Sequence, residues 1–213
     1  MELADFGFQK GCIVEVIVST YGADGKPNAA PMGATMQNES EIALKLFNST
    51  LTLKNLKLTK AAVLNVTSDI NLFYKTTFKE VNPEGKLSQD LFTKSKTVNA
   101  PKLKAAEGTV EVTVKALTAI DNERTMAVCE LQYLDSQELP TKAYCRAHAA
   151  TIESLIHATR IKVFIKDEKR RETVEKLMAL FNECKDIIKK TAPVSTYAEI
   201  MLELEERIEL WKG

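Results

Sequence analysis

Strand patterns occupy the first two thirds of this 213-residue chain, and helix patterns occupy the last third. The clearest strand pair lies at 108–120 and 124–134, where apolar residues alternate with polar ones such as Glu111. Such alternation is typical of antiparallel strands that have one buried and one exposed face. A parallel sheet would instead need strands and helices to alternate along the chain. The order predicts a mainly β, α+β fold: an antiparallel barrel at 1–140, followed by a helical part at 141–213.

Shorter patterns predict the other elements. Pro31 cannot donate a hydrogen bond to a sheet, so its strand is expected to lie at an edge or to contain a bulge. Residues 80–107 are rich in lysine and show no sustained period, which predicts a long loop and a candidate lid. Asp167 and Ser195 are predicted to cap the last two helices. Strands are predicted at 12–20, 28–37, 41–47 and 61–67, and helices at 51–60, 141–160, 167–190 and 195–212.

The balance of charge argues against a nucleic-acid partner. Lys and Arg together number 29, as do Asp and Glu, so no strong field attracts nucleic acid or an anionic membrane. No apolar run approaches the ~18 residues of a membrane helix, and the first residues do not resemble a signal peptide. These features predict a cytoplasmic protein without a membrane partner. Its cysteines lack CxxC spacing and are predicted to be buried thiols, at positions Cys12, Cys129, Cys145 and Cys184.

The familiar catalytic and metal-binding motifs are absent. The chain contains no GxGxxG, P-loop, GxSxG or HExxH pattern. Cys145 and His148 could share a metal ion at i, i+3 spacing, but two ligands without a third do not predict a metal site. Glu153 and His157 are predicted to form a surface pair rather than a catalytic dyad. No catalytic residue is identified.

Hydroxyl and amide residues surround the start of the predicted helix at 51–60. Thr50, Thr52 and Asn55 lie where free N–H groups and the helix dipole favour an anion such as phosphate. Lys45, on the preceding strand, could add a positive charge. The alternative is that Thr50 or Thr52 caps the helix and that Asn55 is a solvated helix residue.

Two further features have both a functional and a structural interpretation. The run Pro31-Met32-Gly33 could approach a flat ligand closely, or it could be an edge strand with a bulge. Asn65 lies inside an apolar strand, and a buried amide must be hydrogen-bonded. Its partner could be a ligand or the backbone.

Three segments of the sequence, in their order along the chain, resemble a known family. PNAAPMG, KLFNSTLTLKNL and AAVLNVTSD are similar to segments of the flavin reductase-like, FMN-binding split-barrel superfamily. Within it, the chain resembles the uncharacterised, largely archaeal DUF447 family. Residues 146–160 also resemble the first C-terminal helix of that family, so the resemblance runs from about residue 12 to 160.

The resemblance implies a homodimeric split barrel that holds FMN near the subunit interface. It assigns Thr50, Thr52 and Asn55 to the phosphate, with Lys45 where relatives often have an arginine. The residues assigned to the flavin ring are Pro31, Met32, Gly33, Asn65, Val66 and Thr67.

Three functions are compatible with these residues. The first is an FMN-dependent oxidoreductase with a small-molecule electron donor and acceptor, in which the cofactor performs the transfer. The second is a non-catalytic flavin or nucleotide binder, such as a sensor or carrier, because fold does not determine function. The third is an interaction protein that works through the helices at 167–190 and 195–212, although apolar stripes are more often core.

Overall fold

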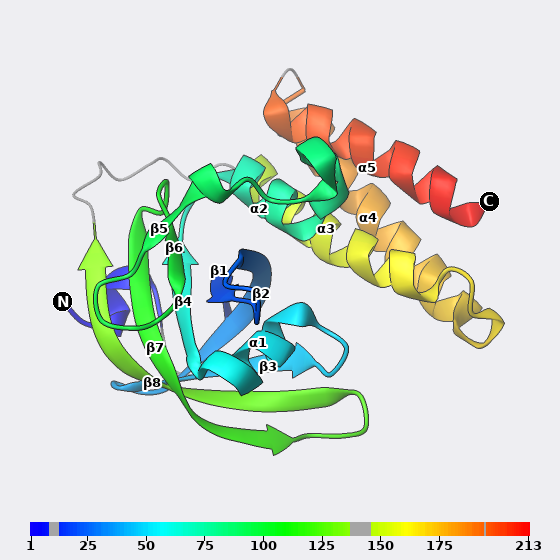
Figure 1. Cartoon of the computed structure of the whole chain (residues 1–213). Coiled ribbons are helices and arrows are strands. Elements are labelled where there is room, and N and C mark those ends of the chain that lie inside the picture. Colours follow the sequence, from blue (N-terminus) through cyan, green and yellow to red (C-terminus); the bar gives the residue numbers. More distant parts are fainter. Residues whose placement is uncertain (9–12, 137–145, 194) are drawn as a thin grey trace. The chain divides into compact units, whose positions relative to one another are not determined.

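The structure is a computed structural model that describes residues 1–8, 13–136, 146–193 and 195–213 (Figure 1). Contacts divide the chain into a barrel unit, residues 1–69 and 75–139, and a helical unit, residues 70–74 and 140–213. The predicted domain boundary at 140 and two of the predicted thiols, Cys12 and Cys145, lie outside the described residues.

Within the described residues, six antiparallel strands close into a barrel in the order β1-β2-β3-β8-β7-β4 (Figure 1). This confirms the predicted antiparallel barrel of the α+β class. The interior is filled by alternate apolar residues of the strands, such as Val16, Val18, Leu64 and Val110. The strands are β1 (Ile13–Tyr21), β2 (Pro27–Asn38), β3 (Glu41–Phe47), β4 (Ala61–Val66), β7 (Gly108–Ala119) and β8 (Arg124–Ser136).

Helix α1 (Leu51–Thr59) contacts β1, β2 and β3 and adds Leu53 and Leu56 to the barrel core. Its apolar residues at 53 and 56 lie one turn apart, so both reach the same side of the helix. The chain leaves the helix through Lys60, whose positive φ of 55° ends the helical geometry.

Among the described residues, the first half of β2 pairs with a strand on one side only. Residues 27–35 pair with β1, whereas pairing with β3 begins at Ala34 and shifts register between Met36 and Asn38. Pro31 therefore lies on an edge, one of the two predicted alternatives, because a residue without an N–H costs nothing where no neighbour accepts. The bulge lies further along the same strand.

The prediction of a long loop at 80–107 was wrong for much of its length. Strands β5 (Phe92–Lys94) and β6 (Pro101–Leu103) pair into a hairpin, which contacts β1 and β4 through β6 (Figure 1). Short 3₁₀ turns at Lys79–Val81, Pro83–Gly85 and Gln89–Leu91 precede it. Three-residue strands are too short to show a period, so this packed hairpin had no sequence signal.

The helical unit contains α3 (Arg146–Phe164), α4 (Arg171–Thr191), α5 (Thr196–Lys212) and the first residues of α2 (Ile70–Thr77). The apolar stripes are core, as Phe181 and Leu204 illustrate at 1% and 0% exposure. Ser195 caps α5 as predicted, accepting from Ala198 N at 3.4 Å. Asp167 instead caps the 3₁₀ turn Glu168–Arg170 that precedes α4.

Two of the titratable predictions can be compared with the structure. Cys129 and Cys184 are free and buried, and burial raises the pKa of Cys129 to about 12. The prediction that His157 forms a surface pair with Glu153 was wrong, because His157 is only 9% exposed; burial is the main cause that lowers its pKa.

None of the described helices is long and apolar enough to cross a membrane. The described residues also contain no group of three His, Cys, Asp or Glu side chains that could hold a metal ion.

Candidate functional site

Polar side chains gather where α1 packs against β1 and β2. Asn55 Nδ2 donates to Thr20 Oγ1 at 3.0 Å, and Asn28 Nδ2 donates to Thr52 Oγ1 at 3.4 Å. Lys79 Nζ donates to Asn28 Oδ1. These four threonine and asparagine residues are at most 5% exposed. We call Thr20, Asn28, Thr52, Asn55 and Lys79 the mouth cluster.

The start of helix α1 was interpreted either as a phosphate site or as a simple helix cap, and the structure gives a different outcome for Thr50 and for Asn55. Thr50 is the N-cap: its Oγ1 accepts from Leu53 N at 3.3 Å and donates to Phe47 O at 2.8 Å. That is the structural alternative, and it is confirmed for Thr50. For Asn55 the same alternative was wrong, because this residue is 3% exposed and bonded rather than solvated.

Three members of the mouth cluster, Thr20, Asn28 and Lys79, were not among the predicted site residues, and Lys79 is the one that carries a charge. Its ammonium is half-buried, and burial lowers its pKa. Asn28 is its partner among the described residues, and no carboxylate there forms an ion pair with it. Buried charges are normally paired, so an ammonium that meets a neutral amide is suited to an anion. Its partner Asn28 lies 51 residues earlier in the chain, so no local sequence pattern marked it.

Lys45 lies apart from these contacts. It is exposed on β3, where its cross-strand partner is Met126 of β8. Its ammonium forms no hydrogen bond or ion pair with the described residues. The positive charge nearest to Thr52 in the hydrogen-bond network is thus Lys79.

The residues predicted to face the ring lie on both faces of their strands. Met32 and Val66 pack against the barrel core. Pro31 lies opposite Ile17, which lies opposite Asn65, so these three share the outer face. Gly33 follows in β2 opposite Glu15. Thr67 is buried and accepts from Asp69 N at 3.1 Å.

Asn65 is fully hydrogen-bonded inside the protein. Its Nδ2 donates to Ile17 O at 2.7 Å, to Ser19 Oγ at 2.9 Å and to Val63 O at 3.2 Å. Its Oδ1 accepts from Leu103 N at 2.8 Å, and Ser19 Oγ donates to Pro101 O at 2.5 Å. Asn65 and Ser19 therefore fasten β6 to the outer face of the barrel.

A buried carboxylate fastens the other end of the hairpin. Glu111 is 0% exposed, although the alternation of β7 predicted that it faces water. Its oxygens accept from Lys96 N at 2.7 Å, from Thr97 N and Oγ1 at 2.6 Å and from Val98 N at 3.3 Å. Burial alone would raise the pKa of this carboxyl, but these hydrogen bonds outweigh it and lower the pKa. The prediction failed because the hairpin covers the second face of the sheet.

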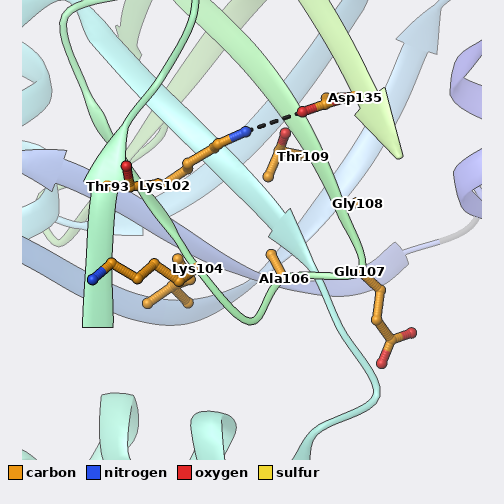
Figure 2. Close-up of a pocket in the computed structure, with 9 residues that line it drawn as sticks. Thr93, Lys102, Lys104, Ala106, Glu107, Gly108, Thr109 and Asp135 are labelled. Carbon is orange, nitrogen blue, oxygen red and sulfur yellow. Dashed lines mark hydrogen bonds and ion pairs between the residues drawn. The ribbon is translucent and has the colours of Figure 1, made fainter. Parts of the chain in front are cut away.

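The described residues of the barrel unit form cavities, and two of these cavities are lined by no residue of the predicted set. One, of about 610 Å³, lies between the turn after β1, the end of α1 and residues 94–100. The other, of about 230 Å³, lies between the hairpin and strands β7 and β8 (Figure 2).

Comparisons with known proteins agree with this architecture. The family model described as "Protein of unknown function (DUF447) N-terminal domain" matches residues 14–140. No curated protein matches the chain. The crystal structure of an FMN-bound DUF447 protein from Methanosarcina mazei is 25% identical with a TM-score of 0.78, covering 96% of this chain and 98% of that one.

A second solved structure supports the fold alone. Nitrilotriacetate monooxygenase component B from Bacillus cereus is 15% identical with a TM-score of 0.51, covering 63% of this chain and 75% of that one. The match of the family model spans more than half of the sequence, and the first structural match spans nearly all of it. The resemblance seen in the sequence is confirmed, and the chain belongs to the DUF447 family.

Proposed function

We propose that the protein binds FMN non-covalently and acts as an oxidoreductase of the flavin reductase-like type. The observation that carries the proposal is the similarity to an FMN-bound member of the same family along 96% of the chain. The proposal includes a homodimer and a small-molecule electron donor and acceptor, as the resemblance implies.

The mouth cluster has the chemistry that the phosphate end of FMN requires. It combines the Lys79 ammonium, the Thr52 hydroxyl and the Asn28 amide at the N-terminal turn of α1. Charge-assisted hydrogen bonds and the helix dipole both stabilise a phosphate at such a position. We therefore assign the phosphate to these residues together with Asn55. In this assignment Lys79, rather than Lys45, supplies the positive charge.

FMN, when bound, supplies the hydride or electron transfer itself. The protein then has to bind the phosphate, orient the ring and exclude water. Because the cofactor performs the electron transfer and the protein only binds and orients it, a chain with two histidines and no catalytic motif could support redox chemistry.

The purified protein is expected to be yellow, to release FMN on denaturation and to lose its visible absorbance when NADH or NADPH is added anaerobically. Mass spectrometry of the released ligand and stopped-flow absorbance measure the two steps, and light scattering measures the subunit number. A colourless protein whose melting temperature does not rise with FMN would contradict the proposal. If neither a nicotinamide nor a deazaflavin donor bleaches the bound flavin, the non-catalytic flavin binder is the function that the result supports.

Lys79→Met is expected to weaken FMN binding by about 10–100-fold, because it removes a charged hydrogen-bond donor worth about 1.5–3 kcal/mol. Quenching of FMN fluorescence by the apoprotein measures Kd. Lys75→Met is the matched control: this lysine is exposed on α2. Equal Kd values for both variants and the wild type would remove Lys79 from the site.

A further inference from the structure

Thr109, a buried threonine of β7, lines the 230 Å³ cavity. Thr109 is 4% exposed, and its Oγ1 has no hydrogen-bond partner among the described residues. Its cross-strand neighbours, Asn65 and Asp135, are both hydrogen-bonded. Because nearly all buried polar groups are hydrogen-bonded, this hydroxyl is suited to a polar ligand at the cavity.

The cavity also presents an ion pair beside this hydroxyl. Lys102 Nζ lies 3.0 Å from Asp135 Oδ2, and Figure 2 shows the pair next to Thr109. The side chains of Lys102 and Asp135 are 25% and 46% exposed, so both retain access to a ligand. The pair offers a donor and an acceptor side by side, while its two charges cancel.

The rest of the lining and the size restrict the occupant further. Leu103, Ala106 and Gly108 give the cavity an apolar part. Its remaining polar lining residues are Thr93 and two further residues of opposite charge, Lys104 and Glu107. Its 230 Å³ is far more than one water needs and less than the roughly 300–1,000 Å³ that holds a drug-sized ligand. The occupant is therefore small and has one polar end.

We infer that this cavity binds a small neutral molecule that carries a primary carboxamide on a compact apolar body. A carboxamide presents a C=O acceptor and an NH₂ donor next to each other, which matches Lys102 and Asp135. Thr109 can donate to or accept from the same group. A charged ligand is disfavoured, because it would have to compete with one member of the ion pair for the other. This site is separate from the mouth cluster and does not depend on FMN.

Benzamide is a suitable probe, and its expected Kd for the wild type is about 1 mM or lower, as for a fragment-sized ligand. Benzoate and benzylamine have the same ring with a negative or a positive group, and are expected to bind at least tenfold more weakly. Isothermal titration calorimetry of the full chain measures all three. Benzoate or benzylamine binding as tightly as benzamide would overturn the assignment of the ligand class.

Thr109→Val keeps the shape of the side chain and removes its hydroxyl, and is expected to weaken benzamide binding about tenfold. Thr113→Val is the matched control: it lies on the same strand, and its Oγ1 accepts from Gln132 Nε2 at 3.0 Å outside the cavity. Equal binding by the two variants would overturn the proposal. So would a crystal soaked with benzamide that shows only water at Thr109.

Discussion

Glu111→Gln is expected to lower the free energy of unfolding by about 3–5 kcal/mol, because it weakens several buried hydrogen bonds to a charged group, each worth about 1.5–3 kcal/mol. Glutamine has the size of glutamate, but one of its terminal atoms is a donor. That NH₂ group would face the N–H groups of Lys96, Thr97 and Val98, which all donate to the carboxylate. Differential scanning calorimetry should show a melting temperature lower by about 10 °C.

The effect should depend on pH in a definite direction. The pKa of Glu111 in the folded protein is lower than its usual value of 4.5. Its contribution to stability is therefore complete above about pH 4.5 and is lost as the pH falls through the folded-state pKa. The difference between wild type and Glu111→Gln is expected to be largest near pH 7 and to shrink below pH 4.

The matched control is Glu130→Gln, which removes an exposed carboxylate from the neighbouring strand β8. Its effect is expected to be within about 0.5 kcal/mol. Hydrogen exchange adds a local measurement, because the amides of Lys96 to Val98 should lose protection in Glu111→Gln. Unchanged protection there would contradict the role of Glu111 as the anchor of the hairpin.

Asn65→Asp is expected to destabilise the barrel by about 3–5 kcal/mol, and Asn65→Leu by about 2–4 kcal/mol. The amide NH₂ faces three acceptors, on Ile17, Ser19 and Val63. Aspartate would place an oxygen against all three, although it could still accept from Leu103 N. Leucine would leave that N–H unpaired without adding a charge. Urea unfolding followed by far-UV circular dichroism measures both variants.

Asn122→Leu, in the exposed turn between β7 and β8, is the control and is expected to change stability by no more than about 0.5 kcal/mol. The order of the two Asn65 variants tests the orientation of the amide. FMN titration distinguishes a structural role of Asn65 from a role in binding. If a variant binds FMN more weakly but has unchanged stability, Asn65 contacts the flavin ring as the sequence predicted.

The sequence predicted the elements whose patterns are long enough to show a period. Strands β7 and β8 are each more than ten residues long and alternate in sequence at 110–115 and 127–133, and α4 carries a regular apolar stripe. Helix α2 and the hairpin β5–β6 were missed, because they are short and their form depends on packing against other segments. Alternation at Glu111 identified two faces of a strand, but not the hairpin that covers the second one.

The candidate site was predictable only where its residues are neighbours in the sequence. Thr52 and Asn55 were recognised because they lie in one short helix after a cap. Lys79 reaches Asn28 from 51 residues away, and no local pattern marks such a contact. For Asn65, burial required hydrogen bonds, but only the folded chain shows that Leu103 and Ile17 supply them.

The way the hairpin is fastened has a consequence for the order of folding. β5 and β6 can pair locally, but a lone two-stranded hairpin is at best marginally stable. Ser19 and Asn65, its anchors on β1 and β4, are 82 and 38 residues from their partners in β6. These two contacts can therefore form only after β1 and β4 have met β6, later than the contacts of Glu111 with residues 96–98, which span at most 15 residues. Interactions that form so late act on the rate of unfolding more than on the rate of folding. The buried anchors would thus set how long the native barrel survives once formed.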